Sequence, residues 1–313
     1  MNPRSLHKQG FSWSSFFGSG LTGVATYLII AILFVIVGYI TVQGWPNLTW
    51  TFITTGVDQG MFTVGKSGVL PMIVGTVAKV ILMTIFVIPV GVITAIYMTE
   101  YAHTRSLTIR FIRGAVNNLA GVPSVVFGLF GLGFFISFVG QNMDAILYPN
   151  SGRPIWGKAA LLWASLTLSV MTLPVVIVAT EEALKAIPLG LREASLALGA
   201  TKLQTIIRIV IPQALPGIMT GGILAVGRAA GEVAPIMFTG AAYFLSGLPQ
   251  NLSSQFMDLG YHVYILSTQS PNIDQTRPLL QATVLVLLVL TFALNIVAIM
   301  IRAQMRRKMR LLQ

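Results

Sequence analysis

The sequence predicts an all-α integral membrane protein with six transmembrane helices. Of its 313 residues, 55% are hydrophobic and only 9% are charged, and the mean hydropathy is +0.80. These values are typical of a chain that is embedded in lipid, and they exclude an ordinary soluble domain. Six apolar stretches are each long enough to cross the hydrocarbon layer, which requires about 20 helical residues.

The first two spans are predicted at residues 22–43 and 68–98. The first follows Arg4 and Lys8, and because its apolar run is longer than that of a cleaved signal peptide, we expect a permanent helix. The second is long enough to tilt or to kink, and Pro89-Val90-Gly91 offers the place for a kink.

The third span is predicted at 115–139, and the fourth, fifth and sixth at 159–180, 213–240 and 278–302. The third is unusually rich in small residues, which favour close approach between helices over exposure to lipid. These residues include Gly121, Ser124, Gly128, Gly131 and Gly133. We divide the chain into an N-terminal segment at 1–21, a membrane domain at 22–302 and a basic tail at 303–313.

Basic residues predict the orientation of the spans. If the N-terminus lies in the cytoplasm, 14 of the 20 Lys and Arg residues fall in cytoplasmic segments and only four in outer segments. Because cytoplasmic loops of membrane proteins collect positive charge, we expect both termini in the cytoplasm. The same rule explains the net charge of +11 without nucleic acid as a partner. The outer four are Lys66, Arg153, Lys158 and Arg277.

Several kinds of chemistry are excluded. The chain has no cysteine, its three histidines are far apart in sequence, and no nucleophile–base set is visible, so we expect neither a metal site nor an enzyme. Residues 60–67 match the phosphate-loop pattern G-x-x-x-x-G-K-[ST]. A phosphate loop needs a buried strand before it in a soluble α/β domain, whereas this match precedes a membrane span and is followed by Pro71. We therefore expect no ATP site in this chain.

A polar loop at about 181–212 separates the fourth and fifth spans. It predicts two short helices, 184–198 and 200–211, with Gly199 at the bend. A structured loop that protrudes from the membrane is what a membrane protein needs to receive force from a soluble motor. The spacing of Glu193, Ala194 and Gly199, closed by Pro212, resembles the signature of ATP-binding-cassette (ABC) importer permeases. Ser195 stands where that signature has alanine.

The fifth span carries two charges, Arg228 and Glu232. A charge at the centre of a membrane helix costs about 2.5–3.5 kcal/mol, so an intramembrane charge is seldom without function. Spaced four apart, the two share a helix face, and we expect this small and polar face to line a pathway. A self-neutralising salt bridge is the alternative. The predicted face comprises Gly217, Gly221, Ala225, Arg228, Glu232, Pro235 and Thr239.

An oxyanion site is the functional interpretation of this pair. The guanidinium of Arg228 is a planar fork of donors that suits oxyanion oxygens. Glu232 would repel a full dianion such as sulfate and accept a hydrogen bond from a protonated phosphate oxygen. Lys79 is a lesser candidate for the pathway, because snorkelling to the outer interface is favoured for it. Glu100, at the inner end of the second span, needs no special role.

Two further segments carry a more specific resemblance. Residues 227–240, GRAAGEVAPIMFTG, and 118–131, NLAGVPSVVFGLFG, resemble the A-type permease subunit of Pst phosphate importers. The similarity covers nearly all of 65–302, although Val233 stands where threonine is frequent. It implies the type I importer permease fold and a place in the bacterial inner membrane. Arg228 and Glu232 match residues that this family uses for phosphate passage.

The resemblance also implies the partners and the mechanism. A C-type permease, two cytoplasmic ATPase subunits that bind ATP and Mg²⁺, and an extracytoplasmic phosphate-binding protein would complete an importer that works by alternating access. The helix at 188–199 would dock in a groove of the ATPase, with Glu193 as the polar contact and Ala194 and Ser195 allowing close packing. Two alternatives stay open: an importer of molybdate, sulfate or phosphonate, and an ion-coupled transporter acting alone. The second predicts internal repeats, and we see none.

Overall fold

The computed structural model describes residues 13–57, 60–63, 67–102 and 107–310. Within these ranges the regular structure is helical, apart from one isolated bridge between Ala241 and Phe256. The phosphate-loop match lies partly outside the described residues, but the element before it is the short helix α2 (Trp50–Thr54) and not a strand. Also outside are Arg4, His7, Lys8, Lys66, His103, Arg105 and residues 311–313 of the tail.

Six segments of the described chain are long and apolar enough to cross a membrane, which confirms the predicted number. They are Ser19–Asn47, Leu70–Tyr101, Ser124–Leu147, Leu161–Lys185, Lys202–Gly231 and Ile273–Arg307. The main helices in them are α1 (Trp13–Gly44), α3 (Leu70–Ile96), α5 (Ser124–Gly131), α7 (Leu161–Lys185), α10 (Ile211–Gly231) and α13 (Ile273–Arg310).

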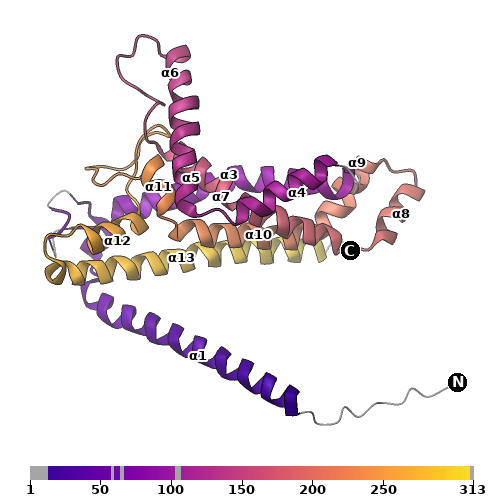
Figure 1. Ribbon diagram of the computed structural model, residues 1–313, viewed down its shortest axis with the longest axis horizontal. Helices are drawn as coiled ribbons and strands as arrows, with labels where there is room; N and C mark the ends of the chain where they lie inside the picture. The colour runs from indigo at the N-terminus through magenta and orange to yellow at the C-terminus, as the bar shows by residue number, and fades with distance from the viewer. Residues whose placement is uncertain (1–12, 58–59, 64–66, 103–106, 311–313) are drawn as a thin grey trace.

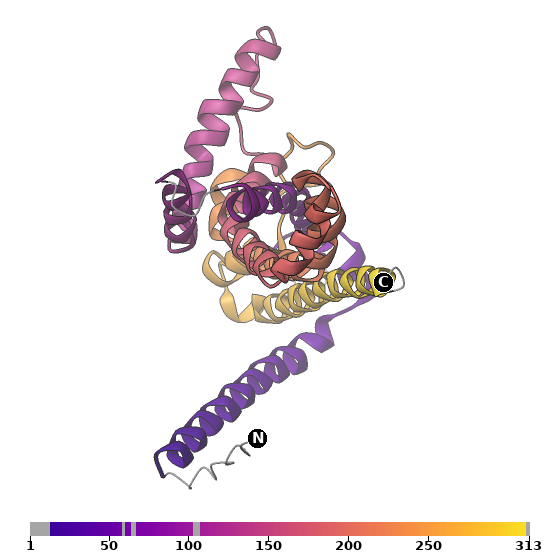
Figure 2. The ribbon, with the colours of Figure 1, turned by 90° about the vertical axis from the view of Figure 1, so that its right-hand side faces the viewer.

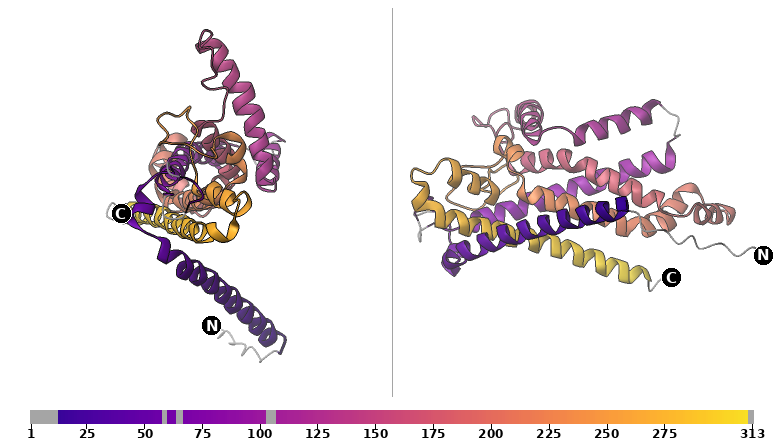
Figure 3. Two further views of the ribbon diagram at one scale, coloured as in Figure 1. Left: turned by 90° about the vertical axis from the view of Figure 1, so that its left-hand side faces the viewer. Right: turned by 60° about the horizontal axis from the view of Figure 1, so that its bottom comes forward.

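Helix α7 is the centre of the bundle. It packs against both α3 and α10, which also contact each other, and α10 in turn packs against α13 (Figures 1 and 2). The most apolar stretch of α7 is 67% buried, whereas that of α1 is 0% buried. Helix α1 touches α13 near Gly44 and then runs apart from the bundle (Figure 3). α1 begins and α13 ends toward the end of the bundle that carries α8 and α9 (Figure 1).

The predicted bounds of the third span are wrong. Helix α4 (Leu107–Ala120) is separate, and α5 begins only at Ser124 and continues through a π-helical stretch into α6 (Gln141–Leu147). Pro123, with φ −57° and ψ 140°, is extended and disfavours a helical conformation of the residue before it. One apolar run therefore forms two helices, and the segment from α5 to α6 lies across the long helices of the bundle (Figure 1).

The fifth span is broken at Glu232. Helix α10 ends at Gly231, Glu232 is extended with φ −78° and ψ 130°, and a short helix α11 (Ala234–Thr239) follows. Pro235 lies in the first turn of α11, where its missing N–H costs no hydrogen bond. The helix face that we predicted from Gly217 to Thr239 therefore runs along a single helix only as far as Arg228. Its remaining members lie beyond the end of α10.

The small residues of that face contribute to helix packing. A side chain on Gly217 would collide with Ala183, and one on Gly221 would lie 2.8 Å from the β-carbon of Ala179. Both alanines belong to α7, so the glycines allow α10 and α7 to approach closely. The part of the predicted face that contains Gly217 and Gly221 is thus a contact between two helices of this chain, and it does not line a pathway.

The polar loop has the predicted form with shifted bounds. Its helices are α8 (Leu189–Ala197) and α9 (Lys202–Thr205), because α7 extends to Lys185 and a π-helical stretch leads from α9 into α10. Gly199 has a φ of +82°, which confirms it as the bend. Its N–H donates to the Leu196 carbonyl and that of Ala200 donates to the Ser195 carbonyl, which is the glycine-terminated Schellman ending of a helix.

Candidate functional site

Arg228 and Glu232 form an ion pair at the break between α10 and α11. The guanidinium Nε donates to the Glu232 carboxylate over 3.2 Å, and the side chains are 41% and 21% exposed. Arg228 lies in the last turn of α10, where the helix dipole favours a cation. Within the described residues the guanidinium forms no other hydrogen bond, so its Nη groups keep donors for an oxyanion.

The exposed side of α10 passes through Arg228. Leu224, Arg228 and Gly231 are exposed at helical spacing, whereas Ala225 and Ala229 are buried. The guanidinium therefore points out of the helical bundle of this chain, and not into a channel enclosed by it. A charge in this position cannot be left against lipid without cost, so another protein surface or a water-filled space must face it.

Lys79 is fully buried, and the snorkelling that we favoured from the sequence is wrong. Its Nζ lies 2.6 Å from the Asp258 carboxylate and donates to the backbone carbonyl of Glu232 over 3.2 Å. A buried lysine is tolerated when a counter-ion and further acceptors satisfy it, and both are present here. Lys79 thus contacts the backbone at the break between α10 and α11. It does so from the buried side, whereas the Arg228 and Glu232 side chains are partly exposed. Asp258 was missed because nothing in the local sequence links it to α3.

Thr239, another predicted residue of the substrate pathway, is buried in α11. Its side chain is fully buried against Gly131, and its hydroxyl donates to the Pro235 carbonyl over 2.9 Å. The hydroxyl is thus satisfied within α11, and it offers no exposed donor beside Arg228. A role for Thr239 in a substrate pathway stays a prediction.

The polar loop presents an apolar surface that we name the loop surface. It consists of the exposed leucines Leu189, Leu191, Leu196, Leu198 and Leu203. Leucines grouped at the tip of a loop are typical of a protein interface. Glu193 and Ala194 are exposed on α8, whereas Ser195 is buried, with its hydroxyl 2.9 Å from that of Thr205. Ser195 therefore packs α8 against α9 within this chain, and its role in packing against a partner stays a prediction. The partly buried Pro212 lies in the first turn of α10.

Arg192 and Glu100 anchor this loop, a contact that the sequence did not reveal. Arg192 Nη2 lies 2.9 Å from the Glu100 carboxylate, and the guanidinium also donates to the carbonyls of Leu184 and Ile187 over 2.8 Å each. The two charged side chains are only 15% and 10% exposed. This cluster joins α8, the end of α7 and the π-helical end of α3. Glu100 therefore has a definite partner, contrary to our expectation.

Glu100→Gln is expected to loosen α8. The amide removes the negative charge from a largely buried guanidinium, and leaving such a group poorly satisfied costs about 1–3 kcal/mol. Amide hydrogen exchange in α8 and α9 should accelerate, while exchange in α7 stays unchanged. Asp274→Asn is the matched control, because the Arg277–Asp274 pair is exposed and contributes little. Equal exchange in the Glu100→Gln variant and the unmodified chain would contradict the anchoring role.

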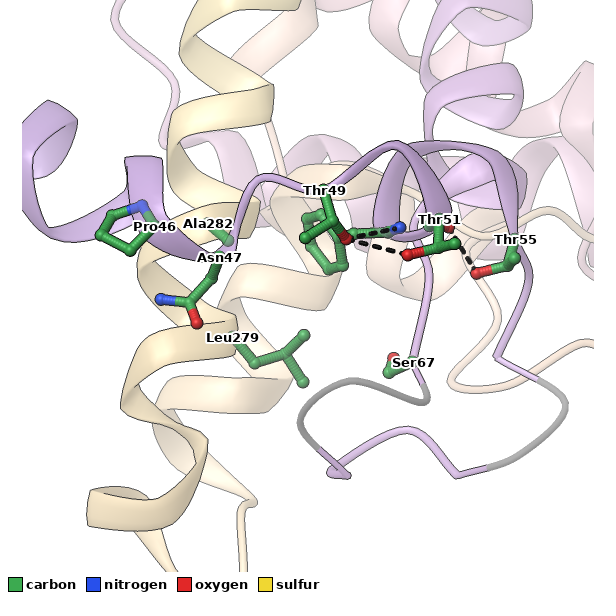
Figure 4. Close-up of a pocket in the computed structure, with 9 residues that line it drawn as sticks. Pro46, Asn47, Thr49, Thr51, Thr55, Ser67, Leu279 and Ala282 are labelled. Carbon is green, nitrogen blue, oxygen red and sulfur yellow. Dashed lines mark hydrogen bonds between the residues drawn. The ribbon is translucent and has the colours of Figure 1, made fainter.

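A cavity of about 120 Å³ lies between the 3₁₀ turn that follows α1 (Trp45–Asn47), α2 and the start of α13 (Figure 4). Its lining includes the hydroxyls of Thr49, Thr51, Thr55 and Ser67, and no charged side chain is among its lining residues. Hydroxyl and amide groups without a cation suit water better than an anion. This cavity therefore does not compete with the Arg228–Glu232 pair as an oxyanion site.

Comparison with known sequences identifies relatives over most of the chain. The family described as binding-protein-dependent transport system inner membrane component matches residues 87–311. The phosphate transport system permease protein PstA 1 of Mycobacterium tuberculosis (strain H37Rv) is 31% identical, over 92% of this chain and 86% of its own length. The probable ABC transporter permease protein YqgI of Bacillus subtilis (strain 168) is also 31% identical, over 80% of this chain and 82% of its own.

Comparison with solved structures supports the architecture. A chain in the crystal structure of a bacterial ABC transporter involved in the import of the acidic polysaccharide alginate matches with a TM-score of 0.60. The match covers 93% of this chain and 98% of that chain, at 17% sequence identity. At this identity the likeness concerns the fold alone.

Proposed function

The chain belongs to the family of binding-protein-dependent transport system inner membrane components, and from this premise we propose that it is the permease subunit through which an ATP-driven importer passes inorganic phosphate. Its fold is that of type I ABC importer permeases, and it is a multi-pass membrane protein. In this family ATP is hydrolysed by partner subunits. We place ATP and Mg²⁺ in those partners and no cofactor in this chain.

The observation that carries phosphate as the substrate is the exposed Arg228–Glu232 pair. A guanidinium with free Nη donors binds an oxyanion through two parallel hydrogen bonds. Glu232, 3.2 Å from Nε, compensates the cation when no anion is bound and keeps anion binding weak enough for release. The relative named as a phosphate transport permease supports this choice of anion.

The exposed position of Arg228 also supports the proposal that a second permease chain is a partner. The guanidinium points outward from the bundle, and a facing chain would convert this exposed side into an enclosed pathway. We propose a C-type permease in this place, with the two chains forming a heterodimer around the pathway. Phosphate would arrive from an extracytoplasmic binding protein at the end of the bundle opposite α8 and α9, where the loop 241–258 lies (Figure 1).

The loop surface supports an ATPase subunit as the other partner. We propose that one ATPase subunit binds the exposed leucines of α8 and α9, with Glu193 at the edge of the contact. The Arg192–Glu100 anchor would make α8 and the end of α3 move together when the ATPase dimer closes. The spans would then tilt, and the pathway beside Arg228 would open alternately to the two sides of the membrane. This assignment places α8 and α9 in the cytoplasm.

An importer of another oxyanion is the competing function, because the name of the Bacillus relative states no substrate. The test is the ATPase activity of the reconstituted complex with its binding protein in the presence of phosphate, sulfate, molybdate or phosphonate. We expect stimulation by phosphate. Stimulation by one of the other anions, with none by phosphate, would establish the competing function.

Glu232→Gln is expected to relax anion selectivity. The glutamine side chain keeps the size of Glu232 but removes the charge that disfavours a dianion, so sulfate should compete with phosphate uptake more strongly than in the unmodified complex. The measurement is inhibition of labelled phosphate uptake by increasing sulfate. Glu182→Gln near the end of α7 is the matched control, since it makes the same chemical change on an exposed glutamate away from the pair. An inhibition curve that does not shift would remove Glu232 from the selectivity mechanism.

A further inference from the structure

A buried ion pair links α3 to the loop that precedes α12 (Leu259–Thr268). Lys79 and Asp258 are 2.6 Å apart, and both side chains are 0% exposed. Asp258 also accepts a hydrogen bond from the Thr76 hydroxyl over 2.9 Å and one from the Tyr261 N–H over 3.1 Å, which caps α12. Thr76 in turn accepts from the Leu259 N–H. The carboxylate is thus held by several donors in one geometry.

The third contact of this pair reaches the candidate site. Lys79 Nζ donates to the backbone carbonyl of Glu232, the residue at which α10 is broken. A carbonyl at a helix end has lost its intrahelical partner and needs another donor. The ammonium group can serve Asp258 and this carbonyl at once, because it has three protons. Lys79 therefore stands between Asp258 and the backbone that carries Arg228 and Glu232.

The loop 241–258 is attached to the rest of the bundle along its length. Its Ser254 carbonyl accepts from the Leu161 N–H over 2.8 Å, and its Leu252 carbonyl accepts from the Leu162 N–H over 3.0 Å, both at the start of α7. Gly75 on α3 lies so close to the Met257 carbonyl that a side chain there would collide with it. A displacement of this loop would therefore act on Asp258 directly.

We propose that Lys79 and Asp258 are positioning residues that hold the α10–α11 break in the geometry that presents Arg228 and Glu232, and that they couple this geometry to the loop 241–258. The inference rests on the proposed function, because that function makes the exposed pair the substrate site. The path is short and continuous: the loop carries Asp258, Asp258 holds Lys79, and Lys79 holds the Glu232 carbonyl. A docking event on the outer loops would be transmitted to the site by these contacts.

If Lys79 and Asp258 only stabilised the fold, a variant in which both residues are neutral would be expected to behave differently from what the positioning role predicts. Removing only Lys79 leaves an unpaired carboxylate in the interior, which damages almost any protein. Removing both charges restores neutrality, and neutral replacements of buried ion pairs are often stable. Asp258→Asn keeps an oxygen that can cap α12, and Lys79→Met keeps the length of the stem without a donor. If the pair only stabilises the fold, the double variant should therefore recover every property.

The experiment compares Lys79→Met, Asp258→Asn and the double variant in the full complex. Because the chain has no cysteine, Gly231→Cys can be added as a probe; it lies next to the break, is exposed and leaves room for a side chain. The measurements are phosphate uptake per molecule of assembled complex and the rate at which the introduced thiol reacts with a membrane-impermeant thiol reagent. Arg277→Gln is the matched control, since it breaks the exposed ion pair at the start of α13.

We expect the double variant to assemble normally but to transport about 10- to 100-fold more slowly, the range that a displacement of about 1 Å produces at a reacting site. The labelling rate of the introduced thiol should change in the same variant, since the Glu232 carbonyl has lost its donor. If Lys79→Met alone does not assemble, the double variant decides. Full recovery of uptake and of labelling in the double variant would overturn the proposal.

The labelling measurement separates this inference from the proposed function. It reports the geometry of the break whatever anion the complex carries. If Arg228→Gln left phosphate uptake intact while thiol labelling still depended on Lys79, the substrate site would be wrong and the positioning role would stand. If uptake depended on Arg228 while thiol labelling were unchanged in all three variants, the positioning role would be wrong and the substrate site would stand.

Discussion

Replacement of Arg228 with glutamine is expected to abolish phosphate uptake while the complex still assembles in the membrane. Glutamine is polar and long enough to reach Glu232, but it has neither the charge nor the planar fork that holds an oxyanion. Each hydrogen bond to a charged group is worth about 1.5–3 kcal/mol. Losing two of them corresponds to a fall of roughly 100-fold or more in uptake. The measurement is the initial rate of labelled phosphate uptake in cells that depend on this importer, divided by the amount of the complex.

Two further variants serve to interpret the uptake measured with Arg228→Gln. Arg228→Lys keeps the charge without the fork and should fall between the unmodified chain and the glutamine variant. Arg277→Gln should transport normally, because its ion pair with Asp274 is exposed and lies at the start of α13. Normal uptake by Arg228→Gln, at a normal amount of complex, would show that phosphate does not pass this guanidinium.

Replacement of Gly199 with valine is expected to uncouple ATP hydrolysis from transport. Gly199 has a φ of +82°, a conformation in which a residue other than glycine costs about 1–3 kcal/mol and a β-branched residue is especially strained. The strain acts at the ending of α8, so the loop surface should no longer present its leucines together. ATP hydrolysis by the complex should continue while phosphate transport falls, and both rates are measured on the same preparation.

Gly190→Val is the matched control for this uncoupling. Gly190 lies in α8 with a negative φ, and at both glycines an added β-carbon meets no atom within 4 Å. The two variants therefore add the same side chain to open space and differ in the backbone strain that it causes. If both variants, or neither, uncoupled hydrolysis from transport, the bend at Gly199 would not be the coupling element.

Local sequence was sufficient for the parts of the fold that composition determines. Six apolar stretches must become six spans, because lipid leaves a helix few alternatives. Gly199 was correctly placed at the bend because a helix that turns sharply out of its last turn needs a residue with positive φ. The signature around Glu193 indicated the permease family, and the family comparison confirms it.

The errors arose where a proline and a long-range contact decide the structure. An apolar run across Gly121-Val122-Pro123 was taken as one helix, although the proline disfavours helix at the residue before it. Pro235 was likewise treated as part of a continuous face, whereas it lies in the first turn of a new helix. Both positions show that proline carries more weight than hydropathy in placing helix ends within a membrane domain.

The contacts of Lys79 and Glu100 could not be found from sequence. Lys79 meets Asp258, and Glu100 meets Arg192, only after the spans pack, and no fixed spacing connects the members of either pair. The burial of these charged side chains agrees with their pairing, since a charge inside a membrane protein is retained when a partner satisfies it. Each pair links α3 or its π-helical continuation to a loop: Lys79 contacts the loop before α12, and Glu100 contacts α8. Helix α3 is thus the element that both loops hold.

The most direct test of the central claim is transport by the purified complex in proteoliposomes. This chain would be reconstituted with a C-type permease, the ATPase subunits and the binding protein, and labelled phosphate would be followed with and without ATP. We predict accumulation of phosphate against its gradient that requires ATP, that excess sulfate or molybdate does not suppress, and that disappears with Arg228→Gln. Accumulation of sulfate or molybdate in place of phosphate, or phosphate entry that is independent of ATP, would contradict the account.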